Sequence, residues 1–303
     1  MFLLILGVET FIAIMKKHIL SLIVLLAFSI GANAGKIVTD SIYSKKLNCW
    51  QKYNVYLPTG YEKSGKEYPV VYLLHGLYGN YSNWDKSGNM KLVADELISS
   101  QEACEMVIVM PNAGASDVRN YQNGYFNVQD WPYEDFFYQE FLPEVESKYR
   151  IIGDKEHRAI MGLSMGGGGS VVYCQRHPDM FSSCYAMSAW LDNKMGEVAG
   201  ANTKKDKLWI VSKSVQDNSA VDFVKNADEE TVKKLKSVKW FVDCGDDDIL
   251  FDVNVLFYQT MRSRKIKCEL RINNGIHNWE YWHLALRNAL PFASRNFGSQ
   301  AQR

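Results

Sequence analysis

A serine set between glycines is the clearest sign of chemistry in this sequence. The residues Gly162-Leu163-Ser164-Met165-Gly166 fit the pattern G-x-S-x-G, in which a serine sits on a tight turn from a strand into a helix. The preceding "HRAIMG" predicts a short buried strand, and the following "GSVVYCQRHPDMF" predicts a helix that stops before Pro178. This context favours a nucleophile elbow at Ser164. The alternative, a glycine-rich phosphate cradle, lacks the Lys-Ser/Thr ending of a P-loop.

Two later loops could supply the base and the acid that a serine nucleophile needs. An apolar strand from Trp240 runs into Gly245-Asp246-Asp247-Asp248, and the next predicted strand, "KCELRINN", runs into Gly275-Ile276-His277. The helical stretch "DVNVLFYQTMRSRK" separates them, so parallel strands would bring both loops to the sheet edge that holds Ser164. Alone, an acidic loop is usually solvated and a lone histidine is usually structural. The order Ser, Asp, His is that of α/β hydrolases, and it favours a catalytic set.

The loop after another predicted strand could help to form an oxyanion hole, which stabilises the negative charge that develops on the substrate's carbonyl oxygen. The apolar strand 70–74 ends in His75-Gly76-Leu77-Tyr78-Gly79. In α/β hydrolases, a backbone N–H from this loop joins the N–H that follows the nucleophile to hold the oxyanion. Leu77 and Met165 are the residues in those positions. We expect His75 to support the loop; as an alternative base it lies on the wrong side of Ser164 in chain order.

These motifs belong to five longer segments: "VVYLLHGLYGNYSNW", "EDFFYQEFLPEVESKYR", "RAIMGLSMGGGGSVVYCQRHPDMFSSCYAMSAW", "CGDDDILF" and "GIHNWEYW". Together they resemble the putative esterase (esterase D-like) family, which includes feruloyl esterases and acetyl xylan esterases of carbohydrate esterase family one, S-formylglutathione hydrolases and mycolyltransferases. The resemblance runs from about Lys36 to Phe297. It implies an α/β-hydrolase fold, with a mostly parallel central sheet, helices on both faces and a small helical insert over the site.

The resemblance also assigns residues within the two later loops. The aspartate of the family's G-x-x-D loop falls on Asp248, and the histidine of its G-x-H-x-(aromatic)-x-x-W ending falls on His277, with Trp282 as the final aromatic. Asp247 remains the alternative acid. One stretch, at about 191–239, matches no single branch of the family; it is charged and partly helical. We expect it to be the insert, and it leaves the acyl specificity open.

The size and charge of the chain agree with a single catalytic domain. The 303 residues include 34 basic and 34 acidic side chains, and this balance argues against a broad nucleic-acid surface. We expect residues 35–303 to form one domain. The six cysteines show no C-x-x-C spacing, so no metal site and no cofactor are predicted. Pairing into disulfides and burial as free thiols both remain open.

The N-terminal segment predicts export. Lys16-Lys17-His18 precede an apolar run from Ile19 to Ile30, and Ala32-Asn33-Ala34 forms an A-x-A cleavage site. We therefore expect residues 1–34 to be a signal peptide, with Met15 as the true start. The run is short for a membrane-spanning anchor, so the mature chain is expected to be periplasmic or secreted, without a stable anchor.

The resemblance and the export signal together predict an exported serine esterase that removes feruloyl or acetyl groups from plant polysaccharide. The expected partner is an ester substrate, either a small molecule or an oligosaccharide. Aromatic side chains near the motifs are candidates for substrate binding: Trp84, Trp131, Trp279 and Trp282. Alternatives are an S-formylglutathione hydrolase-like thioesterase, which belongs in the cytosol, an acyltransferase of the same family, and a hydrolase fold that only binds.

Overall fold

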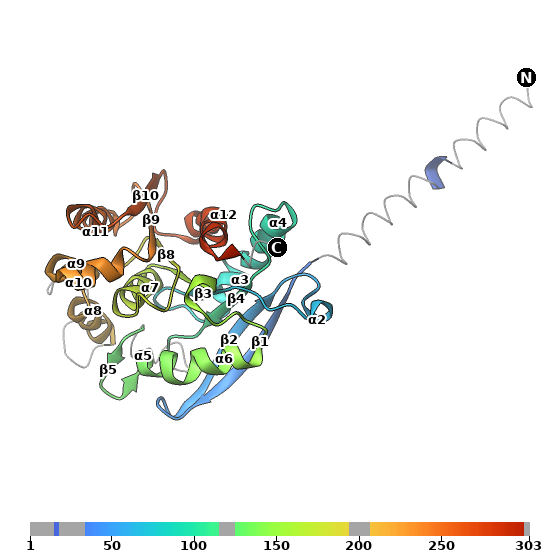
Figure 1. Ribbon diagram of the computed structural model, residues 1–303, viewed down its shortest axis with the longest axis horizontal. Helices are drawn as coiled ribbons and strands as arrows, with labels where there is room; N and C mark the ends of the chain where they lie inside the picture. The colour runs from blue at the N-terminus through green and yellow to red at the C-terminus, as the bar shows by residue number, and fades with distance from the viewer. Residues whose placement is uncertain (1–14, 18–33, 115–124, 194–206, 300–303) are drawn as a thin grey trace, which may run out of the picture.

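The computed structural model describes residues 15–17, 34–114, 125–193 and 207–299 of the chain. Within this part, an eight-stranded sheet has the strand order β1-β2-β4-β3-β7-β8-β9-β10 (Figure 1). All neighbours from β4 to β10 are parallel, whereas β1–β2 and β2–β4 are antiparallel. The mostly parallel sheet of the predicted α/β-hydrolase fold is thereby confirmed. Its strands are β1 (Lys36–Ser44), β2 (Cys49–Leu57), β3 (Val70–Leu74), β4 (Val107–Pro111), β7 (Arg158–Leu163), β8 (Ser183–Met187), β9 (Lys239–Gly245) and β10 (Cys268–Asn273).

The central strands carry continuous apolar runs because both faces of the sheet are covered. Every residue of β3, β4, β7 and β8 is buried, which is typical of parallel strands packed between helices. The strands predicted before His75, before Ser164, before the acidic loop and before His277 are confirmed. A separate two-stranded ladder pairs β5 (Asn127–Val128) with β6 (Trp131–Pro132).

Helices cover the two faces unequally. One face packs against α4 (Met90–Ser99) and α12 (Trp279–Asn296), whose apolar side chains share a core cluster with the sheet. The other face packs against a larger set of helices, which share a second core cluster with the sheet. These are α5 (Tyr133–Phe136), the π-helix η2 (Phe137–Phe141), α6 (Leu142–Lys148), α7 (Met165–Arg176), α8 (Lys207–Asp217), α9 (Ala220–Asn226), α10 (Glu229–Leu235) and α11 (Phe251–Ser263). Single turns form α2 (Tyr61–Ser64), α3 (Asn83–Lys86) and the 3₁₀ helix η3 (Lys155–His157).

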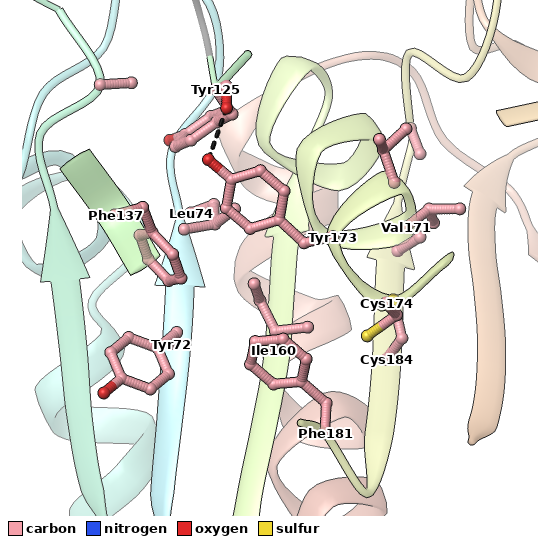
Figure 2. Close-up of a cluster of buried hydrophobic side chains, with 14 of the residues drawn as sticks. Tyr72, Leu74, Tyr125, Phe137, Ile160, Val171, Tyr173, Cys174, Phe181 and Cys184 are labelled. Carbon is pink, nitrogen blue, oxygen red and sulfur yellow. Dashed lines mark hydrogen bonds between the residues drawn. The ribbon is translucent and has the colours of Figure 1, made fainter. Parts of the chain in front are cut away.

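The helix that follows Ser164 is fixed to the middle of the sheet. Figure 2 shows Tyr173 of α7 beside Leu74 of β3 and Ile160 of β7, and all three are fully buried. The Tyr173 hydroxyl donates to the Tyr125 carbonyl at 2.5 Å. Burying a large apolar side chain stabilises a fold by about 1.5–3 kcal/mol. This core therefore holds α7, and with it the start of the helix, in one position.

The structure describes residues 191–193 and 207–239 of the predicted insert, including α8, α9 and α10. Helix α9 packs against α7 and α11. There, the Gln175 side-chain amide donates to the Ala220 carbonyl, and the Ala220 N–H donates to the Leu191 carbonyl, both at 2.8 Å. The placement of an insert over the site remains a prediction.

The predicted signal peptide lies almost wholly outside the described residues, which include only 15–17 and Ala34 of it. No helix in the described part of the chain is long and apolar enough to cross a membrane.

Candidate active site

Ser164 joins β7 to α7 in a strained backbone conformation. Its φ of 53° and ψ of −119° lie outside the regions that non-glycine residues favour. The Ser164 N–H donates to the Met187 carbonyl at 2.9 Å. The Ser164 carbonyl accepts from the N–H groups of Gly168 (3.0 Å) and Trp190 (2.9 Å). The turn is therefore tied to β8 and to the residues after it, which keeps the Ser164 hydroxyl at the carboxyl edge of the sheet.

The glycines around Ser164 allow the backbone to pack closely. A Cβ on Gly166 would lie 2.5 Å from the His75 carbonyl oxygen, a separation that real Cβ atoms essentially never show. A Cβ on Gly168 would overlap the Trp190 carbonyl oxygen. Helix α7 thus begins directly against two neighbouring chain segments, and side chains at these positions would push it away.

His277 connects the serine to a carboxylate. Its Nε2 lies 3.0 Å from Ser164 Oγ, and its Nδ1 lies 3.0 Å from each carboxylate oxygen of Asp248. The loops meet because β9 and β10 are parallel neighbours that end at the same edge. The three side chains therefore form one series of hydrogen bonds, in the order that a nucleophile, a base and an acid require.

Asp248 is ionised although its side chain is fully buried. Burial opposes the charge, but hydrogen bonds from His277, the Leu250 backbone N–H (2.8 Å) and the Ser188 hydroxyl together hold the pKa of Asp248 below its usual value. A carboxylate only accepts hydrogen bonds. Asp248 therefore selects the His277 tautomer that is protonated on Nδ1, which leaves Nε2 free to accept the Ser164 proton.

The two preceding aspartates shape the loop. Asp246 Oδ1 accepts from the Gly275 N–H at 2.9 Å, and the Asp247 N–H donates to the Gly275 carbonyl at 3.1 Å. Both side chains are exposed, whereas Asp248 is buried against His277. The geometry therefore favours Asp248 over Asp247 as the acid.

Leu77 lines the cavity in front of Ser164, and Met165 directly follows Ser164 in the chain. A tight turn, closed by a 3.1 Å bond from the Gly79 N–H to the Gly76 carbonyl, carries Leu77 into the cavity wall. Met165 is the first residue of α7, and the first N–H groups of a helix have no partner within that helix. This arrangement is compatible with the predicted oxyanion site.

His75 lies in this loop as a buried, neutral side chain. Its Nδ1 is 2.8 Å from the Gly76 carbonyl oxygen, and its Nε2 accepts from the Ala113 N–H at 3.0 Å. A ring that accepts at Nε2 carries its proton on Nδ1. Burial lowers the pKa of His75 to about 4. These contacts are those of a residue that supports the loop, as predicted.

A cavity of about 910 Å³ opens above Ser164. Two of the predicted substrate-binding residues, Trp279 and Trp282, lie in its wall. Trp282 meets the His277 ring edge-on, with 4.9 Å between ring centroids and an interplanar angle of 90°. The two indoles also contact each other edge-on, with centroids 5.3 Å apart. This wall is therefore continuous with the proposed base.

The other two predicted tryptophans lie outside this wall. Trp84 is buried and donates from Nε1 to the Leu74 carbonyl at 3.0 Å, while packing edge-on against Trp279. Trp131 is buried and donates to the Ala113 carbonyl at 3.3 Å. Backbone carbonyls satisfy both indole N–H groups, so these large side chains pack in the interior. The structure therefore places Trp84 and Trp131 in the interior, away from the cavity wall, and their role in substrate binding stays a prediction.

Several lining residues were not predicted from the sequence. They follow strands whose carboxyl ends form this edge, and that position could have indicated them. Trp190, Asp192 and Asn193 follow β8, and Tyr78 and Asn83 follow β3. Ile249 and Leu250 directly precede α11, and Asp252, Val253 and Leu256 lie in its first two turns.

In the part of the chain that the structure describes, no group of three or more His, Cys, Asp or Glu side chains is arranged to hold a metal ion. All six cysteines are free thiols. Buried free thiols behave as small apolar side chains, which is one of the two alternatives left open by the sequence.

A family model described as "Putative esterase" matches residues 44–293, which include every residue of this site. The chain belongs to this esterase family. Membership places it among serine ester hydrolases of the α/β-hydrolase fold, in agreement with the mostly parallel sheet.

The esterase also resembles solved structures and curated proteins. It is 50% identical to a ferulic acid esterase, with a TM-score of 0.84 over 87% of this chain and 98% of that one. An S-formylglutathione hydrolase of Staphylococcus aureus, 18% identical, shares the fold with a TM-score of 0.67 over 86% of this chain and 97% of that one. An endo-1,4-beta-xylanase/feruloyl esterase of Xylanibacter ruminicola is 33% identical over 159 residues, 51% of this chain and 22% of that protein. The chain thus matches less than a quarter of the length of this curated relative.

Proposed function

We propose that this esterase is an exported enzyme that removes feruloyl or acetyl groups from plant polysaccharide through an acyl-enzyme on Ser164. The hydrogen-bonded series Ser164–His277–Asp248, at the floor of a cavity with aromatic walls, carries the proposal. The names of two relatives support the acyl group and the polysaccharide: the ferulic acid esterase at 50% identity and the xylanase/feruloyl esterase.

In the acylation step, Ser164 Oγ attacks the ester carbonyl carbon while its proton moves to His277 Nε2. The carbonyl oxygen becomes negatively charged and accepts hydrogen bonds from the Leu77 and Met165 N–H groups. Asp248 stabilises the imidazolium through Nδ1–H. The tetrahedral intermediate then collapses: the carbon–oxygen bond to the alcohol breaks, the alcohol oxygen takes the proton from Nε2, and the acyl group stays on Ser164.

Deacylation repeats these steps with water. His277 Nε2 takes a proton from the water as its oxygen attacks the acyl carbon, and the same two N–H groups hold the second oxyanion. Collapse returns the proton to Ser164 Oγ and releases the carboxylic acid. An acyltransferase would differ only in using an alcohol in place of water.

The charge of the cavity supports a neutral ester as substrate. The charged side chains in the described lining are Asp192 and Asp252, both acidic. They repel anionic substrates, including the net negative glutathione moiety of a glutathione thioester. Trp190, Trp279 and Trp282 offer aromatic surface to a feruloyl ring or a sugar. These features favour a carbohydrate ester over S-formylglutathione.

A direct comparison of substrates tests this proposal. Release of ferulate and acetate from feruloylated and acetylated xylo-oligosaccharides is measured beside hydrolysis of S-formylglutathione. We expect kcat/KM to be at least about tenfold higher for one of the carbohydrate esters, a difference of about 1.4 kcal/mol in transition-state binding. The reverse order would replace the proposal with the thioesterase alternative, and acylated sugar as the main product would indicate transfer.

The nucleophile is tested with a nitrophenyl ester. Ser164→Ala is expected to lower kcat by about three or more orders of magnitude, because the acyl-enzyme cannot form. Ser99→Ala, on an exposed turn at the end of α4, is the matched control and should leave kcat unchanged. Near-normal activity of Ser164→Ala would refute the assignment, and absence of turnover in the unmodified chain would favour a binding protein.

The export part of the proposal rests on the signal-like pattern of residues 15–34. The proposed mature chain is one catalytic domain, residues 35–303, with an insert at about 191–239. The intact mass of protein recovered from its native host should match a chain that begins at Gly35. A mass that includes residues 1–34 would overturn export and revive the cytosolic alternative.

A further inference from the structure

Ser188, close to the proposed acid Asp248, has an unusual backbone conformation. It directly follows β8, is fully buried and has a φ of 45°, which non-glycine residues seldom adopt. Its backbone N–H donates to the Asp243 carbonyl of β9 at 2.7 Å. Strain of this kind, next to a reactive centre, points to a role for the side chain.

The Ser188 hydroxyl is hydrogen-bonded to Trp282 and acts on Asp248. Trp282 Nε1 donates to Ser188 Oγ at 3.0 Å. An indole N–H only donates, and a hydroxyl has a single proton, so the Ser188 proton remains available for an acceptor. The Asp248 carboxyl is close enough for the Ser188 hydroxyl to lower its pKa, and it is an acceptor of this kind. The Cys244 sulfur is also within reach of the hydroxyl, but an ionised carboxylate is the stronger acceptor.

The same indole contacts the base. The Trp282 ring meets the His277 ring edge-on at 4.9 Å between centroids. Its neighbour on α12, Tyr281, donates from its hydroxyl to the Asp243 carboxylate at 2.5 Å and so fixes this helix end to β9. Trp282 therefore contacts both the His277 ring and the Ser188 hydroxyl.

We propose that Ser188 is a positioning residue, which carries a hydrogen bond from the Trp282 indole to the Asp248 carboxylate and sets the charge and orientation that Asp248 presents to His277. This inference rests on the proposed function, because Ser188 acts through the Ser-His-Asp series. The O–H dipole of Ser188 offsets part of the carboxylate charge. Without it, Asp248 would stabilise the imidazolium more strongly, and the imidazolium would persist to higher pH.

The other ionisable groups near Asp248 lie on β9. Burial and the charge of Asp248 raise the pKa of the Cys244 thiol well above its usual value, so this thiol stays neutral. Asp243 faces the opposite side of the strand, where Tyr185 and Tyr281 donate to it, and burial raises its pKa. Among the described residues, His277 is therefore the side chain on another element whose ring hydrogen-bonds directly to Asp248.

The pH profile of Ser188→Ala tests this role, with a nitrophenyl ester as substrate. We expect the acid limb of kcat/KM to move up by about 0.3–0.5 pH unit, a fraction of the shift that a full charge produces. We expect kcat to fall about tenfold with KM unchanged, the effect of one hydrogen bond on a barrier. Asp248→Asn should move the limb the opposite way, since the charge is lost. In the double variant, Ser188→Ala should shift the limb no further.

Ser183→Ala is the matched control. Ser183 is a buried serine of β8 whose hydroxyl has no hydrogen-bond partner among the described residues, and its removal should leave the acid limb in place. Trp282→Phe keeps an aromatic ring but removes the N–H. It should move the limb upward by less than Ser188→Ala, and it provides the test if Ser188→Ala does not fold.

An acid limb that stays in place in both Ser188→Ala and Trp282→Phe would overturn the inference, whatever the change in kcat. Failure of the proposed function would appear differently, as turnover that survives in Ser164→Ala.

Discussion

Burial of His75 links the stability of this esterase to pH. The pKa of His75 is lowered to about 4 from 6.5 because its ring is removed from water. Below pH 6.5 the unfolded chain binds a proton at this residue that the folded chain does not, so a fall in pH favours unfolding. The loss continues until the folded protein is protonated near pH 4. A difference of one bound proton changes the free energy of unfolding by about 1.4 kcal/mol per pH unit. Roughly 3 kcal/mol of stability is therefore lost between pH 6.5 and pH 4.

The variant His75→Gln isolates this contribution. A glutamine amide can accept from the Ala113 N–H and donate to the Gly76 carbonyl, but it does not titrate. The free energy of unfolding is measured by urea titration of both proteins between about pH 4 and pH 7.5. We expect the wild type to lose its advantage over His75→Gln as the pH falls, by about 1.4 kcal/mol for each unit below 6.5.

A constant difference between the two proteins across this range would refute the reasoning. It would mean that His75 binds a proton equally well in the folded and the unfolded chain. The experiment needs no substrate, so its outcome is independent of the catalytic assignments.

Other substitutions probe the site and its support. Asp248→Asn should lower kcat by roughly three to four orders of magnitude, because the imidazole loses its orienting carboxylate, and Asp247→Asn should do far less; the opposite ranking in steady-state kinetics would identify Asp247 as the acid. Gly168→Ala should destabilise the fold by about 1–3 kcal/mol or more through backbone overlap, and an unchanged Tm would contradict this packing. Glu146→Leu leaves the buried Arg158 guanidinium without the carboxylate that it contacts at 2.7 and 2.8 Å; we expect urea unfolding to show a loss of about 3–5 kcal/mol, and a loss under about 1 kcal/mol would indicate a solvated pair.

Much of the fold is predictable from short stretches of sequence. The buried strand before Ser164 and the turn after it depend on local apolar runs and glycines, which act within a few residues. The meeting of Ser164, Asp248 and His277 is predictable for a different reason: parallel strands end at the same edge, so residues that follow them converge.

The cavity wall is harder to predict because burial depends on packing between distant segments. The sequence does not distinguish Trp84 from Trp279, because both are tryptophans close to a motif. In the structure Trp84 is buried behind the cavity wall, and Trp279 forms part of that wall. Ser188 carries no local signal either. Its contacts come from β9 and α12, which lie far along the chain.

The glycine-rich start of α7 has a consequence for the order in which this molecule comes apart. Each glycine costs a helix about 1 kcal/mol relative to alanine, so the four from Gly166 to Gly169 cost about 4 kcal/mol. The first turn of α7 is therefore stabilised by packing and not by its own helix propensity. It packs against the end of β3, the residues after β8 and Tyr125. When those contacts loosen, the turn that positions the Ser164 hydroxyl opens before a helix such as α11, which contains neither glycine nor proline. Enzymatic activity should therefore be lost as soon as the packing at the centre of the sheet loosens. Most of the helical backbone is still folded at that point.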